Sequence, residues 1–436
     1  MTSTETQRVN IRTEAIAGIT TFFTMAYIVV VNPAIIATEG TGMAFSGVMT
    51  ATVLICFAMT LLMGLYAKLP FAVAPGMGIN AFFTYTIILQ QGVWWQTALG
   101  IVFWSGVLFL LISLTRTRET IAKAIPTELR LGTAAGIGIF LAFIGLRNAG
   151  MIEADPVTFV RLGTLGLPAV LAIAAMGISV LLLTRKSPFA YLAGIFVASL
   201  IGWALGLVKT PERMFSAPDF QTVFLKLDIF GALKLSLLPA IIAVLFTDLF
   251  DSISTFIGVA HAADMLDENG DPRNLKQGLI VDSFATFGAG LAGTSPGTAY
   301  IESMAGISAG GRTGLTSVFT AFCFLPCFFL APLAGAVPIF ATAAVLVLVG
   351  ASMFHSIGKI NFVKIEEGLP AFLTMILIPL TFSITQGILW GFIAHTGLYL
   401  MVGRWREIHP MMYALTVIAV GLLMIEHSEV FGLLHG

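Results

Sequence analysis

The chain has 436 residues, of which 57% are hydrophobic and 10% charged, and its net charge is −1. Soluble globular chains carry about 25% charged residues, and one membrane span needs about 20 apolar residues. Apolar runs of that length fill nearly the whole chain, which predicts an all-α polytopic membrane protein in a lipid bilayer and leaves no room for a soluble catalytic domain. The basic residues are scattered, so no nucleic-acid partner is predicted.

Fourteen membrane spans are predicted from the apolar runs. In chain order they cover residues 14–37, 45–66, 70–90, 94–114, 132–149, 165–184, 188–207, 233–260, 277–292, 293–309, 313–334, 336–354, 368–384 and 386–402. A further apolar stretch, residues 411–424, is either a helix at the membrane interface or an extra span. Residues 1–13 are predicted to be cytoplasmic, because this orientation places most of the 22 basic residues inside.

Short matches relate the two halves of the chain. Residues 23–27 in span 1 resemble residues 246–250 in span 8, and the Pro-Gly pair at 75–76 in span 3 matches the pair at 296–297 in span 10. Seven is an odd number of spans, so a second copy must be inverted in the membrane. We therefore predict a seven-plus-seven inverted repeat.

Spans 3 and 10 are predicted to be broken, at Pro75, Gly76 and Gly78 and at Pro296 and Gly297. Proline and glycine continue a helix poorly, and irregular backbone at membrane depth is tolerated only where it lines a cavity or is buried in protein. Helices are expected to start just after each break and to point their positive ends at the site. Paired broken spans predict a substrate site near the bilayer midplane.

Carboxylates at mid-membrane depth are few. Asp248 and Asp251 lie in span 8 and Glu302 lies in span 10. A buried charge costs roughly 3 kcal/mol or more, so these residues are expected to face a cavity or a partner. Asp248 and Asp251 share a helix face and disfavour simultaneous ionisation, which makes them and Glu302 candidates for proton coupling. Sodium coupling remains open. Asp282 is expected near the headgroups, within reach of Lys276.

No cofactor or metal site is predicted. Cys56, Cys323 and Cys327 lie in apolar stretches and are interpreted as packing residues, and the six histidines show no metal-ligand spacing. A membrane-embedded enzyme would need a nucleophile with a base or a metal cluster, and none is visible. A receptor would not need paired broken helices. A transporter is therefore the favoured class.

Four segments resemble the AzgA-like purine permeases of the nucleobase/ascorbate (xanthine/uracil permease) superfamily. They are residues 18–33 (GITTFFTMAYIVVVNP), 76–81 (GMGINA), 246–251 (FTDLFD) and 294–303 (TSPGTAYIES). The resemblance runs in order from about residue 10 to residue 402. It implies a uracil-permease-like fold in which spans 3 and 10 carry short extended segments that pair across the site. It also implies a homodimer formed through the gate domain.

The resemblance also implies roles for individual residues. The superfamily's Pro-x-Thr-x-Tyr-x-Glu run, whose glutamate holds the base, matches Pro296, Thr298, Tyr300 and Glu302. The span 8 acid that also holds the base falls at Asp248.

Other positions depart from uracil permease. Ser252 and Ser303 replace a histidine and an asparagine of that permease, which argues against a uracil or xanthine carrier. Asp251 has no counterpart there. Asn80, in span 3, both donates and accepts hydrogen bonds and is expected to assist substrate binding.

The predicted function is symport of a purine base (hypoxanthine, guanine or adenine) with a proton, importing it across the cytoplasmic membrane. The resemblance implies an elevator-like movement of a core domain, residues 14–116 and 233–334, against a gate domain, residues 117–232 and 335–402, with a tail at 403–436. Which purine is preferred stays open. An anion carrier of the related sulfate permease type is an alternative, disfavoured because two buried carboxylates would repel an anion.

Overall fold

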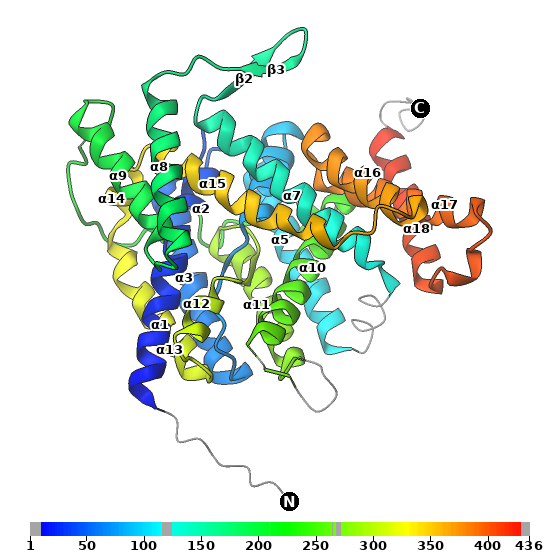
Figure 1. The fold of residues 1–436 in the computed structure, drawn as a ribbon, viewed down its shortest axis with the longest axis horizontal. Helices are drawn as coiled ribbons and strands as arrows, with labels where there is room; N and C mark the ends of the chain where they lie inside the picture. The colour runs from blue at the N-terminus through cyan, green and yellow to red at the C-terminus, as the bar shows by residue number, and fades with distance from the viewer. Residues whose placement is uncertain (1–9, 116–123, 209, 264, 267–271, 429–436) are drawn as a thin grey trace, which may run out of the picture.

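The computed structural model describes residues 10–115, 124–208, 210–263, 265–266 and 272–428, and most of them are helical (Figure 1). Residues 1–9 of the predicted cytoplasmic segment, the predicted core–gate boundary at 116–117 and residues 429–436 of the tail lie outside these ranges. In the first half the elements are α1 (Ile11–Met25), α2 (Ile28–Ile36), α3 (Phe45–Leu62), β1 (Val73–Pro75), α4 (Met77–Ala81), α5 (Trp95–Leu114), α7 (Thr127–Asn148), β2 (Ile152–Asp155), β3 (Phe159–Leu162), α8 (Leu167–Thr184) and α9 (Ala190–Ala204).

The second half contains helices and one strand. They are α10 (Leu238–Ala262), α11 (Leu275–Ala292), β4 (Gly297–Ala299), α12 (Ser303–Ser308), α13 (Gly314–Phe324), α14 (Ala331–Gly335), α15 (Ile339–Phe354), α16 (Ile365–Thr381), α17 (Ile384–Met401) and α18 (Pro410–Ser428). Residues Met63–Ala67 and Phe82–Gln90 continue α3 and α4 as π-helix. The apolar stretch at 411–424 is thus helical, and whether it spans the membrane stays open.

Seven helical stretches within the described residues are long and apolar enough to cross a membrane. They are Ile11–Ile36, Phe45–Ala67, Trp95–Leu114, Thr127–Asn148, Leu167–Thr184, Leu235–Ala260 and Ile339–Lys359. The count of fourteen spans stays a prediction. Several predicted spans consist of shorter pieces: the region of span 10 holds a strand of 3 residues and a helix of 6 residues.

Two strands lie where the Pro-Gly pairs predicted interruptions. β1 and β4 pair antiparallel, with Val73 opposite Ala299 and Pro75 opposite Gly297. Their assignment to broken membrane spans stays a prediction. A third interruption was not predicted: the first apolar run divides at Ala26 and Tyr27, between α1 and α2.

A hairpin departs from the expected all-α fold, in which only spans 3 and 10 were expected to carry extended segments. β2 and β3 pair antiparallel, with Ile152 opposite Leu162, in the segment between predicted spans 5 and 6. The Arg161 Nε–H donates to Glu153 across the hairpin at 2.9 Å. In Figure 1 this hairpin projects away from the helices. Polar cross-strand pairs of this kind suit an exposed ribbon outside the apolar layer.

The helices pack in two groups, each of which combines helices from both halves of the chain. In the first group α1 packs on α12 and α13, α3 on α11 and α13, and α5 on α10 and α11. In the second, α7 packs on α15 and α16, α16 on α17, and α8 on α9 and α15. α7 and α15 approach closely at Gly138 and Gly350, where a Cβ on Gly350 would lie 2.3 Å from the Gly138 carbonyl oxygen. These groups use the segments predicted as core and gate, and their relative movement stays a prediction.

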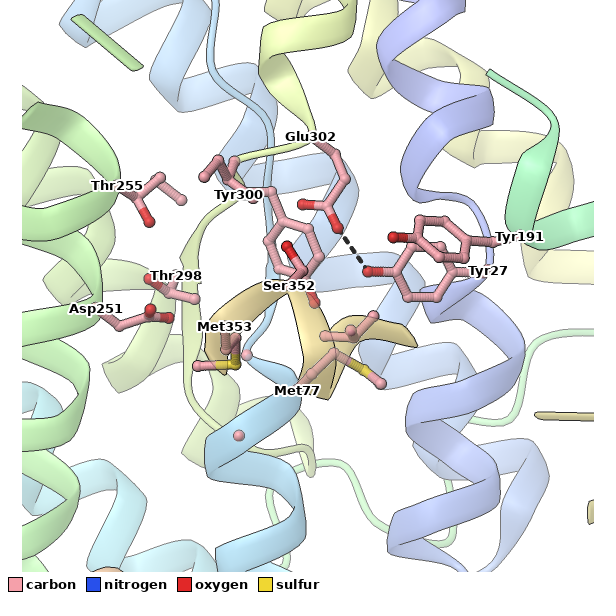
Figure 2. A pocket seen from close by; sticks show the side chains of 15 residues that line it. Tyr27, Met77, Tyr191, Asp251, Thr255, Thr298, Tyr300, Glu302, Ser352 and Met353 are labelled. Atoms are coloured by element: carbon pink, nitrogen blue, oxygen red, sulfur yellow. Dashed lines mark hydrogen bonds between the residues drawn. The ribbon is translucent and has the colours of Figure 1, made fainter. Parts of the chain in front are cut away.

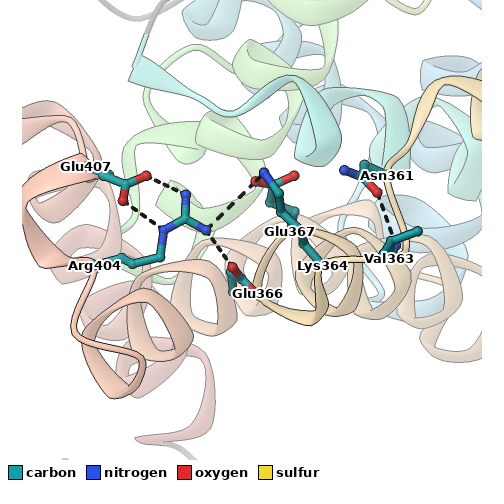
Figure 3. Close-up of polar contacts among 7 residues, drawn as sticks. All are labelled: Asn361, Val363, Lys364, Glu366, Glu367, Arg404 and Glu407. Carbon is teal, nitrogen blue, oxygen red and sulfur yellow. Dashed lines mark hydrogen bonds and ion pairs between the residues drawn. The ribbon is translucent and has the colours of Figure 1, made fainter.

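A cluster of charges ties the start of α16 to the segment after α17 (Figure 3). Arg404 pairs with Glu366 and with Glu407, and Lys364 pairs with Glu367 at 3.0 Å. The hydrogen bond from Arg404 lowers the pKa of the Glu407 carboxyl. The cluster thus links two neighbouring helices of the second group at one end.

Candidate functional site

The paired strands β1 and β4 form the centre of the candidate site. The Gly76 N–H donates to the Pro296 carbonyl and the Tyr300 N–H donates to the Ala72 carbonyl, both at 2.9 Å. Thr60 on α3 satisfies both backbone groups of Val73, at 2.9 and 3.0 Å. These backbone groups thus have partners inside the protein, as extended backbone in an apolar layer would require.

A pocket opens beside these strands and holds about 540 Å³ of empty space, including its open part. Its lining comes from several elements and is drawn in Figure 2: Tyr27, Gly76, Met77, Gly78, Tyr191, Asp251, Thr255, Thr298, Ala299, Tyr300, Ile301, Glu302, Val349, Ser352 and Met353. Residues from both helix groups therefore line one pocket.

Glu302 lies at the N-terminus of α12 and its carboxylate faces the pocket. Its Oε1 accepts a hydrogen bond of 2.8 Å from the hydroxyl of Tyr27, which sits in the break between α1 and α2. The ring of Tyr27 packs edge-on against Tyr191 of α9, with centroids 4.9 Å apart. Tyr27 therefore orients one carboxylate oxygen, and Oε2 has no hydrogen-bond partner among the described residues.

Asp251 and Thr255 of α10 lie on the side of the pocket away from Tyr27 and Tyr191 (Figure 2). The Asp251 carboxylate is half-buried and makes no hydrogen bond or ion pair with any residue that the structure describes. An ionised carboxylate without a partner in such a place is costly. The pocket thus has acceptors on two walls.

Two further carboxylates, Asp248 and Asp282, lie behind β4 and are fully buried. Asp282 accepts from Ser252 and, at 3.4 Å, from Thr298. The expected pairing of Asp282 with Lys276 is therefore wrong, because its place in α11 turns it toward α10 and β4; its depth in the membrane stays a prediction. Neither Oδ1 atom of the two aspartates has a hydrogen-bond partner among the described residues.

Asp248 is connected to β4 through Thr286 of α11. The Thr286 hydroxyl lies within hydrogen-bond reach of Asp248 Oδ2 and of the Gly297 carbonyl, the latter at 3.1 Å. The Thr286 hydroxyl carries one proton, so it donates to one of these two acceptors at a time. Asp248 is not in the pocket lining, whereas Asp251, one turn further along α10, is.

Asn80 lies away from the pocket in a buried polar network. α4 begins at Met77, just after the Pro-Gly pair, and Asn80 falls in its last turn. Its Nδ2 donates to Asn32 Oδ1 at 2.9 Å, and Asn32 Nδ2 donates to Thr294 at 2.9 Å, just before β4. The network joins the two strand-bearing segments. Gly78 permits a close approach of α7, because a Cβ there would lie 2.3 Å from Ile137.

Comparison with known proteins identifies the family. The model of the xanthine/uracil permease family, described as a permease family, matches residues 12–390. The chain belongs to this family. It is 42% identical to the adenine permease AdeP of Escherichia coli (strain K12) over 95% of this chain and 92% of that protein. It is 39% identical to the guanine/hypoxanthine permease PbuO of Bacillus subtilis (strain 168), covering 94% of this chain and 97% of that protein.

The fold also matches a known transporter structure. The transmembrane domain of the cyanobacterial bicarbonate transporter BicA superposes with a TM-score of 0.67 at 18% identity, covering 88% of this chain and 98% of that domain. At this identity the likeness concerns the fold alone. With the family match and the apolar helices, it establishes a multi-pass membrane permease and confirms the resemblance to the AzgA-like branch.

The structure brings together only some of the residues expected at the permease site. Gly76, Gly78, Thr298, Tyr300 and Glu302 line the pocket, and so does Asp251. Pro75, Pro296 and Gly297 form the strand backbone beside it, with the Pro75 carbonyl accepting from the Tyr300 hydroxyl. The roles of all these residues stay predictions.

Sequence reasoning missed the side of the permease pocket that α9 and α15 form. Tyr191 on α9 and Val349, Ser352 and Met353 on α15 come from the segments predicted as gate. Nothing local distinguishes them from other apolar-span residues. A tyrosine near the start of an apolar run was the single available signal, since its polar tip needs a partner when buried.

Proposed function

We propose that this permease is a purine nucleobase:proton symporter that imports the base across the cytoplasmic membrane, with its N-terminus inside. The observation that carries the proposal is the pocket with Glu302 on one wall and Asp251 on another, each offering a carboxylate oxygen without a partner among the described residues. Relatives named as adenine and guanine/hypoxanthine permeases support the substrate class.

The chemistry of the walls suits a neutral heteroaromatic base. Carboxylates accept hydrogen bonds and donate none when ionised, so they match ring N–H and exocyclic NH₂ groups. The rings of Tyr27 and Tyr300 add flat apolar surface. Two carboxylates facing one pocket repel an anion, which disfavours the alternative of an anion carrier of the sulfate permease type.

We propose that the coupled proton is carried by the buried carboxylates behind β4. When Asp248 is ionised, the Thr286 hydroxyl donates to it; when Asp248 is protonated, Thr286 is free to donate to the Gly297 carbonyl instead. Thr298 connects Asp282 to the pocket in the same way. Protonation behind the strand would thereby change the hydrogen bonding of the strand that leads to Glu302.

The proposed cycle is an elevator-like movement of the core against the gate. Support comes from the position of the pocket, whose lining combines Glu302 and Asp251 with Tyr191 and Ser352 from the predicted gate. A base bound there moves away from the gate residues when the core moves. Asn80 assists indirectly, by holding its segment to that of β4 through Asn32. We propose a homodimer through the gate on the family resemblance.

The test is uptake into proteoliposomes that contain the purified full-length chain. Labelled hypoxanthine, guanine and adenine are offered under an inward proton gradient, an inward sodium gradient, or neither, with unlabelled xanthine and uracil as competitors. Accumulation of a purine base under the proton gradient alone supports the proposal. Accumulation under the sodium gradient alone contradicts proton coupling, and uptake of none of the bases contradicts the substrate class.

Asp248→Asn tests the coupling role. We expect exchange of base across the membrane to persist while accumulation driven by the proton gradient is lost. Accumulation that still collapses with a protonophore as in the wild type would show that Asp248 is not the coupling group.

A further inference from the structure

We propose that the hydroxyl of Tyr191 is a substrate-binding group, contributed to the site by the predicted gate segment. This inference rests on the proposed nucleobase function and adds a residue that the family motifs do not include. Tyr191 is the second residue of α9, far in sequence from β4 and α12, and its side chain lines the same pocket as Glu302.

The hydroxyl of Tyr191 lacks a partner in a place where tyrosine hydroxyls normally have one. The residue is 8% exposed, and its hydroxyl makes no hydrogen bond with any residue in the described part of the chain. In Figure 2 the hydroxyl end of the ring points toward Glu302 and not into the surrounding helices. Buried tyrosine hydroxyls usually find a hydrogen-bond partner, so this one is available for a ligand in the pocket.

The ring of Tyr191 is held in position by contacts that do not use the hydroxyl. It packs edge-on against Tyr27 at 4.9 Å between centroids and 61° between planes. Tyr27 in turn donates to Glu302. A tyrosine loses only two side-chain torsions on ordering, so a pre-positioned ring presents its hydroxyl at low entropic cost.

The two groups complement each other chemically. Ionised Glu302 only accepts hydrogen bonds, whereas the Tyr191 hydroxyl also donates. A base lying between them therefore presents an N–H to Glu302 and a ring nitrogen or carbonyl oxygen to Tyr191. Each of these purines has a donor beside an acceptor on one edge (N1–H beside O6 in guanine and hypoxanthine, the exocyclic NH₂ beside N1 in adenine), so one edge serves both residues. A ligand without an acceptor beside its N–H would gain nothing from Tyr191.

The contact also depends on the conformation of the permease. Tyr191 belongs to the predicted gate segment and Glu302 to the predicted core segment, so a base that bonds to both bridges the two groups of helices. Movement of the core would break the Tyr191 bond while Glu302 keeps its own. The affinity for the base then differs between the conformation described here and one in which the core has moved.

The test replaces one hydroxyl at a time in the full-length protein. Tyr191→Phe keeps the ring and its contact with Tyr27 and removes only an unbonded hydroxyl, so the ligand-free melting temperature should not change. Tyr399→Phe is the matched control: Tyr399 on α17 is also 8% exposed, its hydroxyl also lacks a partner among the described residues, and it lies outside the pocket lining. Binding of hypoxanthine, guanine and adenine is measured for wild type and both variants by calorimetry.

We expect Tyr191→Phe to weaken binding of the preferred base about fivefold, as for one net hydrogen bond, and Tyr399→Phe to leave it unchanged. Equal affinity of wild type and Tyr191→Phe for every base that wild type binds overturns this inference and leaves the proposed function standing. An equal loss in both variants also overturns it, because the effect would not be local to the pocket. Absence of binding by the wild type overturns the proposed function and this inference together.

Discussion

Replacing Glu302 with glutamine tests the substrate site most directly, because the two side chains have nearly the same shape. Glutamine keeps one oxygen, which can still accept the 2.8 Å hydrogen bond from Tyr27. The amide NH₂ then takes the place of Oε2, the oxygen with no partner among the described residues. A donor thus faces the pocket where the proposed base presents its own N–H, and both the charge and the acceptor are lost.

The size of the effect follows from the bond that is lost. A hydrogen bond to a charged group contributes about 1.5–3 kcal/mol, which corresponds to roughly 10- to 150-fold in affinity. Repulsion between the glutamine NH₂ and the N–H of the base adds to this loss. We therefore expect Glu302→Gln to weaken base binding at least tenfold and to abolish uptake at base concentrations near the wild-type KM, while the protein remains folded in the membrane.

The assay compares base binding and proteoliposome uptake for wild type, Glu302→Gln and a control, Glu39→Gln. Glu39 is exposed and lies outside the pocket lining, so its substitution removes the same charge without touching the site. Melting temperatures of the ligand-free proteins establish that all three are folded. Affinity of Glu302→Gln within twofold of wild type would refute the role of Glu302 as the acceptor for the base.

Three further predictions concern other parts of the permease. Asp251→Asn should weaken base binding about tenfold and not lower the ligand-free melting temperature, since it removes an unpaired charge. Unchanged affinity would contradict a contact between Asp251 and the base. Gly350→Ala should cost about 1–3 kcal/mol of stability, because its Cβ would meet the Gly138 carbonyl, whereas Gly421→Ala, with open space around it, should not; equal melting temperatures would contradict this packing. Arg404→Gln should lower the melting temperature near neutral pH, and the difference should vanish in acid; a difference that persists there would exclude the ion pairs as its cause.

The sign of the last prediction follows from the carboxyl beside Arg404. Hydrogen bonding to Arg404 lowers the pKa of Glu407 below its ordinary value of 4.5. A carboxyl with a lowered pKa in the folded protein contributes stability above its ordinary pKa and loses it as the pH falls through the lowered value. Glu407 is exposed and Arg404 is only partly buried, so the change in melting temperature should be small.

Much of this permease was predictable from short local patterns. The Pro-Gly pairs at 75–76 and 296–297 mark two interruptions, because these residue types disfavour helix wherever they occur. The isolated carboxylate of Glu302 indicated a functional site for an equally local reason, the cost of a charge among apolar residues. The order of the motifs around them indicated the permease family, which the comparison confirms.

The partners of these residues were not predictable, because they come from remote segments. Asp248 and Asp251 share one helix face in the sequence pattern, yet packing of α11 and β4 against α10 leaves Asp251 at the pocket and encloses Asp248 with Thr286. For Asp282 the sequence offered only the neighbouring Lys276 as a partner, whereas Ser252 and Thr298, from other segments, contact it in the structure. A single sequence contains no record of which helix faces meet.

Composition, periodicity and a few turn-forming residues therefore determined the class of the protein, the positions of its two Pro-Gly interruptions and the carboxylate at its centre, since these depend on the local cost of burying charge and irregular backbone. Tertiary structure decided which groups meet across the pocket: Tyr27 with Glu302, Tyr191 with Tyr27, and Asp251 without a partner among the described residues. Those contacts depend on the packing of helices distant in sequence, and that packing is a property of the folded chain as a whole.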